Sequence, residues 1–540
     1  KGKVKDLNIE HFTLGLLTET SLSTRGNLQI RKDKNPYFDL AIEKFYTTRR
    51  DIQSILVDSL IPNSIALPDW LNIKAQGKGT FDSPSAKAVI TSNLGLIELD
   101  AALKKNAVTG SSKYSGTLTL TEFQTGRLLK QEDILGPLNL NVSVDGSGFT
   151  MDEVDTKIKL QVNSFTYQGY DYQNFALEGT LKKYFFSGNA QFQDENLNFK
   201  LDGDLDYNEE IPNYHFTFEL KNADFKALNF TDRPLKARGT VDVDLATADF
   251  KVINGKMDIR KFAIFNGKDM YAVDSLLFAS IDQEGQSEIS VRSDIVDGNF
   301  EGTINLYSLP EVVRRHFNNY FSLHDTTYNK PATPQNFTFD LKIKNTDLLT
   351  EVILPDLDPF VPGEIVGKFD SEEDRLDLNI GLAKVRYAGI GTDSITFNVT
   401  SDKKALAYTL AVRKIQMDSI RIEAVKVHGD VANDSIRTKF VILDSLQKDK
   451  YLFGGVFNSL EKVFQFRFLK DQVVMNYAPW SAPSDNSLQF TSRGIQAQNF
   501  SITNINEKIS LVTSNDQDSI VSVQFKDLNL QNITKMVEGA

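Results

Sequence analysis

The chain of 540 residues contains no cysteine, which excludes disulfides, iron–sulfur clusters, cysteine-ligated zinc and thiol catalysis. The absence does not identify a compartment, because oxidising and reducing spaces both contain cysteine-free proteins. Histidine is scarce as well, with five residues and no His-Glu-x-x-His zinc pattern among them. Thiol and redox chemistry are therefore excluded before any other motif is considered.

No stretch of about 18 consecutive apolar residues occurs, so we expect no helix that spans a bilayer. The net charge of −12 and the pI near 5.1 argue against a nucleic-acid partner, because such a surface needs clustered lysine and arginine. The chain begins with Lys1-Gly2-Lys3 and not with methionine and a signal sequence. This start predicts a processed product or a segment of a longer protein.

The dominant pattern is the alternation of apolar and polar residues along short segments. Leu138, Leu140 and Val142 alternate with Asn139 and Asn141, and many other segments behave in the same way. A period of two residues puts every second side chain on the same face of a β-strand. Turn residues recur at intervals of roughly 8–12 residues, which is typical of antiparallel strands and not of strand–helix–strand units.

Helical periodicity is confined to six short segments, and proline ends several of them. The predicted helices cover residues 48–60, 123–135, 224–230, 309–323, 347–354 and 528–537. The sequence Gly79-Thr80-Phe81-Asp82-Ser83 recurs almost unchanged as Gly367-Lys368-Phe369-Asp370-Ser371 after a similar proline-rich connection, which indicates an internal repeat. We therefore expect one continuous repetitive segment over residues 1–540, with repeat groups at 1–121, 122–221, 222–304, 305–344 and 345–540.

At about 11 residues per strand and turn, the chain would contain on the order of 40 strands, and open sheets rarely exceed about ten without curling or splitting. A stack of β-sandwiches would bury the apolar side chains in closed cores. One long curled sheet would line a continuous groove with the same side chains and extend to roughly 190 Å at a strand spacing of about 4.8 Å. The strand number favours the second arrangement. The predicted fold class is therefore all-β with a few short helices, in which one long, curled, mainly antiparallel repetitive sheet forms an elongated U-shaped hydrophobic groove.

Signals for catalysis and metal binding are weak. His316 and His324 share one segment, but packed or solvated histidines explain this spacing better than a metal site does. The run Asp202-Gly203-Asp204-Leu205-Asp206 resembles the start of a calcium loop, yet Tyr207 and Asn213 replace the required glycine and glutamate, so a solvent-facing acidic strand is the better interpretation. No phosphate-binding loop and no nucleophile elbow occur. We predict no enzyme, no cofactor and no metal site.

Several segments resemble the TamB family, a branch of the AsmA-like proteins related to bridge-like lipid-transfer proteins. The likeness lies in Phe123-x-x-Gly126-x-Leu128-Leu129, in Leu135-Gly136-Pro137-Leu138 leading to Val144-Asp145-Gly146-Ser147-Gly148, and in Tyr167-x-Gly169-Tyr170-x-Tyr172-x-Asn174. Residues 61–68 and 224–229 are similar too, and the resemblance is best between Leu60 and Ser308. The abundance of Asn, Lys, Tyr and Phe resembles members from Bacteroidota.

The resemblance implies a periplasmic segment of a lipid bridge. Such proteins have an N-terminal anchor in the inner membrane, and their C-terminal region meets an outer-membrane assembly barrel of the TamA type. Neither end is evident in this chain, so it would be the middle of such a protein. The implied partners are phospholipid and, through the missing ends, the inner membrane and the barrel. The implied function is passage of phospholipid between the two membranes along the groove, with a role in outer-membrane biogenesis.

The side chains expected to line the groove are apolar members of the alternating segments. They are Leu138, Leu140, Val142, Ile158, Leu160, Val162, Phe199, Leu201, Phe216, Phe218, Val241, Val243, Phe339, Leu341, Leu378, Ile380, Phe397 and Leu410. The alternative is that these are ordinary residues of closed cores, and the alternation is the same in both cases.

Two other functions remain open. An elongated scaffold or chaperone for outer-membrane proteins would use exposed sheet edges instead of a groove. A secreted β-sandwich adhesin would consist of compact domains joined by linkers rich in Gly, Pro or Ser, and such linkers are not evident in the sequence.

Overall fold

The computed structural model describes residues 6–528 except 31–34, 56–61, 63, 106–110, 250, 323–332, 354–356, 362, 388–389, 418–419, 461–462, 492–493 and 515–516. It contains 35 strands, labelled β1 to β35, which pair antiparallel with their neighbours and confirm the predicted antiparallel β-fold. Contacts divide the chain into two compact units. Unit 1 comprises Lys1–Ala246 and Ile259–Ala272, and unit 2 comprises Thr247–Asp258 and Val273–Ala540. The finer division into five repeat groups stays a prediction.

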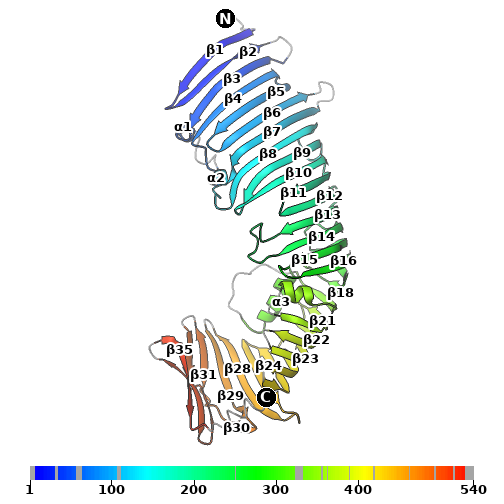
Figure 1. The fold of residues 1–540 in the computed structure, drawn as a ribbon, viewed down its shortest axis with the longest axis vertical. Helices are drawn as coiled ribbons and strands as arrows, with labels where there is room; N and C mark the ends of the chain where they lie inside the picture. Colours follow the sequence, from blue (N-terminus) through cyan, green and yellow to red (C-terminus); the bar gives the residue numbers. More distant parts are fainter. Residues whose placement is uncertain are drawn as a thin grey trace. The chain divides into compact units, whose positions relative to one another are not determined.

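Unit 1 is built from successive antiparallel strands, each paired with the next (Figure 1). These strands are β1 (Asp6–Leu16), β2 (Thr20–Gln29), β3 (Tyr37–Thr48), β4 (Trp70–Thr80), β5 (Ser83–Ser92), β6 (Gly95–Lys105), β7 (Ser112–Gln124), β8 (Leu135–Ser147), β9 (Asp155–Tyr167), β10 (Tyr170–Lys182), β11 (Phe185–Gln193), β12 (Leu197–Asp206), β13 (Asn213–Asp224) and β14 (Lys236–Ala246). In the described part of unit 1 the strands contact their sequence neighbours, and all of them belong to one sheet. This sheet therefore forms a single layer.

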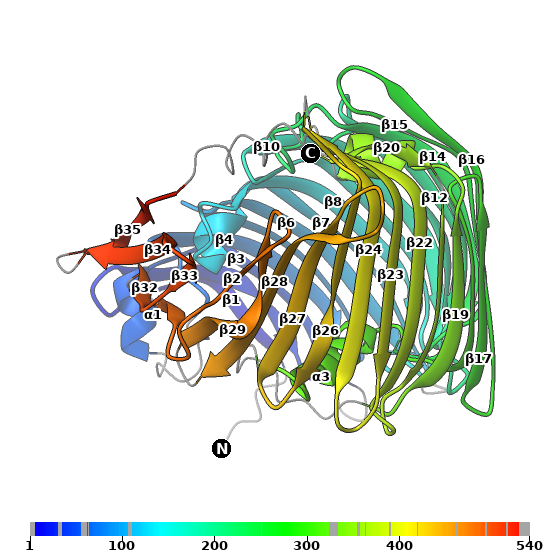
Figure 2. The same ribbon diagram turned by 90° about the horizontal axis from the view of Figure 1, so that it is seen from below.

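The strands β15 (Asn254–Phe265) and β16 (Met270–Gln283) are divided between the two units. Unit 2 continues with β17 (Gln286–Ser293), β18 (Val296–Thr303), β19 (Asn336–Ile343), β20 (Leu357–Val361), β21 (Glu364–Asp370), β22 (Arg375–Tyr387), β23 (Ile390–Ser401), β24 (Leu406–Met417), β25 (Ile420–Ile422), β26 (Ala424–Ala432), β27 (Ser435–Leu443), β28 (Asp449–Leu460), β29 (Val463–Met475), β30 (Ala478–Trp480), β31 (Ser487–Thr491) and β32 (Gly494–Gln498). Its last strands, β33 (Ser501–Asn504), β34 (Glu507–Ser514) and β35 (Gln517–Lys526), form a separate three-stranded sheet. Figure 2 shows β22 to β24, β26 and β27 as strongly curved ribbons.

The described helices lie where helical periodicity occurs, but they are shorter than predicted. They are α1 (Arg49–Ile55), α2 (Thr125–Leu129), α3 (Leu309–Asn318) and the π-helical turn η2 (Leu349–Ile353). The helix predicted for 224–230 is wrong, because the backbone there forms only turns. The Asp224 carboxylate accepts a hydrogen bond from the Ala227 amide at 3.1 Å, and Asn229 adopts a left-handed φ of 62°, which ends the helix after one turn. The helix predicted for 528–537 lies outside the described residues beyond Leu528.

Local irregularities bend the strands of unit 1 at a common level. The register shifts beside Leu120 on β7 and beside Leu220 on β13, and Asn174 on β10 has a φ of 58°. An extra residue in one strand increases the local twist and bends that strand. Leu120 and Leu220 belong to the same row of side chains across the sheet, so the bends are aligned from strand to strand.

Glycine makes room for aromatic rings that lie across neighbouring strands. A Cβ atom on Gly179 of β10 would lie 2.6 Å from the ring Cζ of Phe186 on β11. In unit 2, a Cβ atom on Gly367 of β21 would lie 2.4 Å from the ring Cζ of Phe339 on β19. The rings therefore cover backbone that has no side chain of its own, which stabilises a bent sheet at glycine positions.

We expect Gly367→Ala to destabilise the protein by about 1–3 kcal/mol, because the added methyl group forces the Phe339 ring out of its place. The matched control is Gly381→Ala on the adjacent strand β22, where an added Cβ meets no atom within 4 Å. Urea unfolding followed by circular dichroism measures both variants. Equal shifts of the two midpoints would contradict the assignment of the glycine to the ring.

Candidate functional site

The antiparallel register aligns the apolar side chains of unit 1 into rows that cross the sheet. Residues directly opposite each other on antiparallel strands point to the same face. Row A consists of Leu14, Leu22, Phe45, Ile73, Ile90, Ile97, Leu120, Leu140, Val162, Phe175, Phe192, Phe199 and Leu220. Row B consists of Phe12, Thr24, Ile42, Ala75, Ala88, Leu99, Leu118, Val142, Leu160, Leu177, Ala190, Leu201, Phe218 and Val241. Row C consists of Leu40, Gly77, Ala86, Ala101, Gly116, Val144, Ile158, Gly179, Gly188, Gly203, Phe216 and Val243.

The three rows place all the groove residues predicted in unit 1 on one face of the sheet. Row A contains Leu140, Val162 and Phe199; row B contains Val142, Leu160, Leu201, Phe218 and Val241; row C contains Ile158, Phe216 and Val243. Leu138 lies beyond row A on the same strand, opposite Phe123 and Phe165. Most of these side chains are half-buried, and even the best covered, Val162 and Val243, are 8% and 9% exposed. Their role in binding lipid stays a prediction.

The opposite face of unit 1 carries charged side chains. Lys159 on β9 and Glu178 on β10 are partners in the register, and their side chains form an ion pair at 2.8 Å. Lys87 and Asp100 form a similar pair at 2.7 Å between β5 and β6. Exposed pairs of this kind stabilise a protein little. They show instead that this face is solvated, so the two faces of the sheet differ sharply in polarity.

One end of row A is covered by an aromatic cluster. Tyr172 and Phe192 are 4% and 6% exposed and pack with Leu228, which is 1% exposed and comes from the turn after β13. The Tyr170 hydroxyl donates a hydrogen bond to Asp194 Oδ1 at 2.5 Å. Burial and this hydrogen bond raise the pKa of Tyr170 to about 12, so its phenol stays neutral and binds the carboxylate. The cluster closes the strip of half-buried side chains at this edge.

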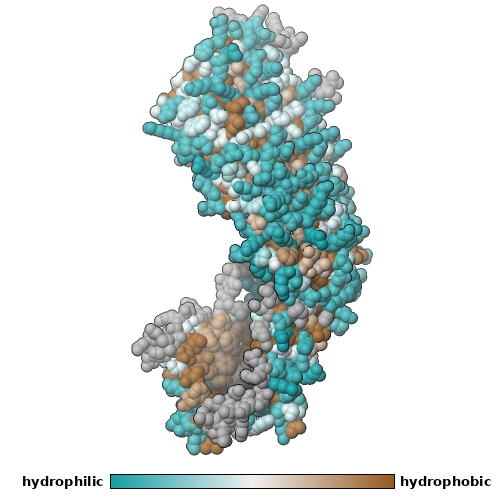
Figure 3. All heavy atoms as spheres, in the orientation of Figure 1, coloured by the Kyte–Doolittle hydropathy of each residue, from teal (hydrophilic) through white to brown (hydrophobic). Residues whose placement is uncertain are grey.

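Unit 2 contains three comparable rows. Row D consists of Phe337, Phe369 and Leu376, and then Ser401, Leu406, Val431, Ile436, Phe457 and Phe466. Row E consists of Ile289, Phe300, Phe339, Gly367, Leu378, Val399, Tyr408, Gly429, Thr438, Gly455 and Phe468. Row F consists of Phe278, Val291, Gly298, Leu341, Ile365, Ile380, Phe397, Leu410, Val427, Phe440, Phe453 and Val473. The predicted residues Phe339 and Leu378 lie in row E, and Leu341, Ile380, Phe397 and Leu410 lie in row F. Figure 3 shows a broad apolar area over β24 to β28.

Helix α3 and the residues after it pack on this apolar face along row D. Two clusters of buried side chains form the contact. The first contains Val312, Ile289, Ile304, Phe337 and Phe369, and the second contains Tyr320, Phe321, Val399, Leu406 and Val431. The apolar side chains of α3 therefore complete a core with row D that the sheet does not have by itself. The sequence gives the amphipathic helix but no sign of the surface on which it packs.

The segment from Asn319 to Ser322 joins four hairpin turns of unit 2. The Tyr320 hydroxyl lies 2.8 Å from the carbonyl oxygens of both Asp374 and Asp402, and Asn319 Nδ2 donates to Asp374 Oδ1 at 2.7 Å. These bonds reach the turns between β21 and β22 and between β23 and β24.

The same segment continues to the next two turns. The Asp434 amide donates to the Tyr320 carbonyl at 2.9 Å, and the Ser322 amide donates to Asp434 Oδ1 at 2.8 Å. The Ser459 hydroxyl donates to the Ser322 carbonyl at 2.6 Å near the turn between β28 and β29. In a flat sheet the first and fourth turns would be about 29 Å apart, whereas the backbone from residue 319 to 322 spans about 10–11 Å at most. The strand ends must therefore converge on this segment, and the sheet of unit 2 is bent there.

The three-stranded sheet covers another part of unit 2. Ile502 of β33 packs with Val473, Met475 and Trp480, and Ile509 of β34 lies against the same cluster. Val473 is 1% exposed, in contrast to the other apolar side chains of row F, which are half-buried. Row F is thus covered at β29 and less covered from β19 to β27.

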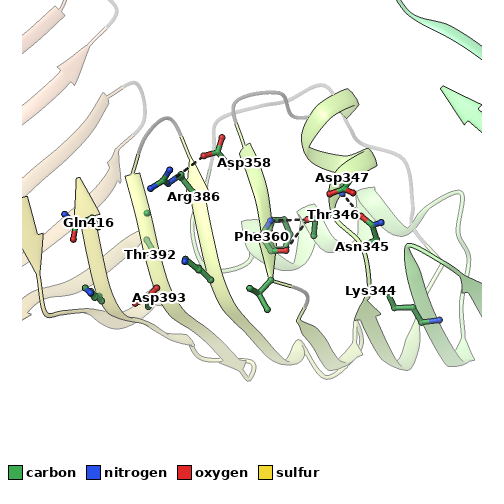
Figure 4. A pocket seen from close by; sticks show the side chains of 14 residues that line it. Lys344, Asn345, Thr346, Asp347, Asp358, Phe360, Arg386, Thr392, Asp393 and Gln416 are labelled. Carbon is green, nitrogen blue, oxygen red and sulfur yellow. Dashed lines mark hydrogen bonds and ion pairs between the residues drawn. The ribbon is translucent and has the colours of Figure 1, made fainter. Parts of the chain in front are cut away.

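A polar cavity of about 880 Å³ lies between the segment after β19 and the strands β20, β22, β23 and β24 (Figure 4). The Phe360 amide donates to the Thr346 hydroxyl at 3.1 Å at its edge, and Arg386 lies 3.8 Å from Asp358. Lys384 and Lys414 also line the cavity, but aspartates on the same walls offset most of their charge. The cavity was not predicted, because its residues resemble an ordinary solvated surface in the sequence. Its mixed charge specifies no ligand.

The residues considered for metal binding serve the fold. His316 is 4% exposed, and its Nε2 lies 3.0 Å from the Ser401 hydroxyl. His324 lies outside the described residues. Asp202 and Asp204 belong to strand β12, as the acidic-strand interpretation predicts. The described part of the chain contains no group of three or more His, Asp or Glu side chains suited to a metal ion.

Comparison with protein-family models, with curated proteins and with solved structures gives no match to this chain. Among the residues that the structure describes, no helix has both the length and the apolar character needed to cross a membrane. The candidate site therefore rests on its own geometry: half-buried apolar rows on one face of each unit.

We expect Tyr320→Phe to loosen the convergence of the hairpin turns, because the hydroxyl that bonds to Asp374 or Asp402 is lost. Leaving these carbonyls without a partner costs about 1–3 kcal/mol. Hydrogen exchange of the backbone amides in α3 and in the turn at residues 402–405 should become faster, while exchange in unit 1 stays unchanged. Unchanged protection in α3 would show that the hydroxyl does not hold the segment in place.

Lowering the pH should destabilise the packing of α3, because His316 then takes up a proton. Burial lowers the pKa of His316 below its ordinary value of 6.5, with Asp374 opposing the shift in part. Since the unfolded chain takes up the proton more readily than the folded one, the stability around α3 is full above about pH 6.5 and decreases as the pH falls below it. Hydrogen exchange of the α3 amides between pH 7 and 5, corrected for the intrinsic rate, measures this decrease. His316→Gln, which can keep the bond to Ser401, should remove it, and an equal decrease in that variant would contradict the role of the imidazole.

Proposed function

We propose that this chain is a segment of a lipid-transfer protein that binds the acyl chains of phospholipids on its apolar sheet face. The observation that carries the proposal is the unbroken alignment of row B across all the strands from β1 to β14, beside a parallel row A. A closed core would require a second layer over these rows, whereas the described strands of unit 1 all belong to a single sheet and most side chains of the rows are only half-buried.

The physical basis of the proposal is that an acyl chain would bury a similar amount of its surface at every strand. An acyl chain that leaves water gains about 0.8 kcal/mol for each methylene group that it buries. Leu, Ile, Val and Phe recur from strand to strand along the rows, so a lipid that moves by one strand meets a similar surface. A surface without a deep trap favours sliding, while the polar headgroup stays in water beside the strip.

The wider proposal follows from the resemblance to the TamB family. In it, the sheet is curled into an elongated U-shaped hydrophobic groove that bridges the periplasm. The groove carries phospholipid between an inner membrane, which holds the anchor of the full-length protein, and an outer membrane, where a TamA-type barrel binds its C-terminal region. The chain then acts in outer-membrane biogenesis and performs no catalysis.

One observation favours the alternative of a scaffold for β-strand proteins. Strand β1 pairs with β2 on one side only, within the described residues, and its Leu7, Phe12 and Leu16 are 44%, 45% and 48% exposed. An extended segment of another protein could add to such an edge. Crosslinking from β1 to an unfolded barrel protein supports the scaffold, whereas crosslinking from rows A and B to phospholipid supports the lipid-transfer function.

Aspartate on the apolar face tests the proposal. We expect Val142→Asp and Ile380→Asp to fold, because a carboxylate on a half-buried face still reaches water, and to lose phospholipid binding several-fold. The matched controls are Asn141→Asp and Asn379→Asp, which place the same charge one residue away on the polar face. Circular dichroism monitors folding, and retention of radiolabelled dioleoylphosphatidylethanolamine after gel filtration measures binding.

Two results would count against the lipid-binding face. Unfolding of both apolar-face variants would indicate a closed core, in which an unpaired carboxylate is strongly unfavourable. Lipid retention equal to that of the two controls would show that the acyl chains do not contact rows B and F.

A further inference from the structure

On the apolar face of unit 2, several side chains of row D are much more deeply buried than those of row F. In row D, Phe337, Phe369 and Val431 are 4%, 2% and 3% exposed. In row F, Phe397 and Leu410 are only half-buried, although they lie on the same strands as buried members of rows D and E. The difference follows the position of α3, which covers row D and leaves row F only partly covered, with Phe397 packed against the margin of the α3 cluster.

Row F is flanked by better covered residues on its other side as well. Val412 and Val425 are opposite each other on β24 and β26, two residues along the strands from row F, and they are 8% and 6% exposed. Consecutive rows on one face are about 7 Å apart along a strand. Row F from β19 to β27 and the half-buried row E side chains Phe339, Leu378 and Tyr408 therefore form a lane about two rows wide. In unit 1 the rows A, B and C form a strip about three rows wide.

Helix α3 and residues 319–322 are fixed to the sheet by polar and aromatic contacts. Beyond the hydrogen bonds to four hairpin turns, the Phe321 ring stacks on Phe457 and Phe464 with ring centroids 5.9 and 6.1 Å apart. His316 meets the Phe369 ring edge-on at 5.2 Å. Polar and aromatic contacts thus hold both the helix and the residues of the turn after it against row D.

We propose that α3, with Tyr320 and Phe321, is a side wall that keeps acyl chains in unit 2 off row D and confines them to rows E and F. The proposal rests on the proposed lipid-transfer function and sharpens its substrate. A lane of two rows suits phospholipids with two acyl chains, one lying along each row. It excludes lipids whose several acyl chains must lie side by side, and unit 1 accepts these more readily. Phe397 and Leu410 are then contact residues, and row D is a structural surface.

Photocrosslinking at defined positions of the full chain tests this wall. The residue p-benzoylphenylalanine replaces, in separate variants, Phe397 in row F, Phe369 in row D, Phe218 in row B and Thr396 on the polar face. Each variant is incubated with vesicles of radiolabelled dioleoylphosphatidylethanolamine and irradiated. We expect lipid adducts at 218 and 397 that exceed those at 369 and 396 several-fold.

A second label position in row D controls for the possibility that the label at Phe369 displaces α3. Phe457 is half-buried in row D and stacks on Phe321, and p-benzoylphenylalanine there should also give little adduct. Hydrogen exchange in α3 verifies that both row D variants keep the wall. Combining the label at 369 with Phe321→Ala and Tyr320→Phe should raise its adduct toward that at 397.

The possible outcomes distinguish a failure of the proposed side wall from a failure of the proposed lipid-transfer function. Adducts at 369 and 457 as strong as those at 397, with α3 intact, would overturn the wall and leave the lipid-transfer function standing. No rise at 369 after the double substitution, with α3 exchange accelerated, would overturn the wall as well. Absence of adducts at both 218 and 397, or adducts at 396 equal to those at 397, would overturn the proposed function itself.

Discussion

The antiparallel hydrogen-bond register is the constraint on which the rest of the structure depends. Alternation along one strand makes one of its faces apolar, but only the register decides whether the apolar residues of neighbouring strands meet. In unit 1, Leu118, Val142 and Leu160 are aligned on β7, β8 and β9. A slip of one residue in any pair would turn a whole strand over and interrupt every row. The continuity of rows A and B is therefore the cumulative result of many pairings in register, and the proposed lipid-binding face depends on it.

Several local features bend the hydrogen-bonded sheet. Bulges beside Leu120 and Leu220 bend the strands at one level, and glycines such as Gly367 receive aromatic rings from the next strand. In unit 2 the decisive device is a single segment, because Tyr320 and Ser322 hold hairpin turns that a flat sheet would keep far apart. The same segment supplies Phe321 to the core. Bending of the sheet and covering of row D therefore have a common cause.

The sequence predicts local features well and distant contacts hardly at all. Alternation places Leu140 and Val142 on one strand face, and proline and glycine mark the turns, because these signals act within a few residues. The turn at 224–230 was mistaken for a helix, since the Asp224 hydrogen bond and the left-handed Asn229 outweigh a short apolar period.

The position of α3 could not be predicted, because nothing local links Tyr320 to Asp374 and Asp402, which are 54 and 82 residues away. The polar cavity beside Arg386 escaped prediction for the same reason, since its walls come from separate strands. The set of candidate residues was thus obtained from the sequence, while the difference between the open row F and the covered row D was not.

If the apolar face binds lipid as proposed, alternate residues of one strand contact lipid and water. The absence of cysteine makes a single-cysteine scan of β9 from Lys157 to Val162 direct, with a nitroxide label at each position and electron paramagnetic resonance before and after addition of phospholipid vesicles. We expect labels at 158, 160 and 162 to lose accessibility to a water-soluble nickel relaxant when lipid is added, and labels at 157, 159 and 161 to keep it. A response without this period of two, or no response at any position, would contradict a lipid-binding face on this sheet.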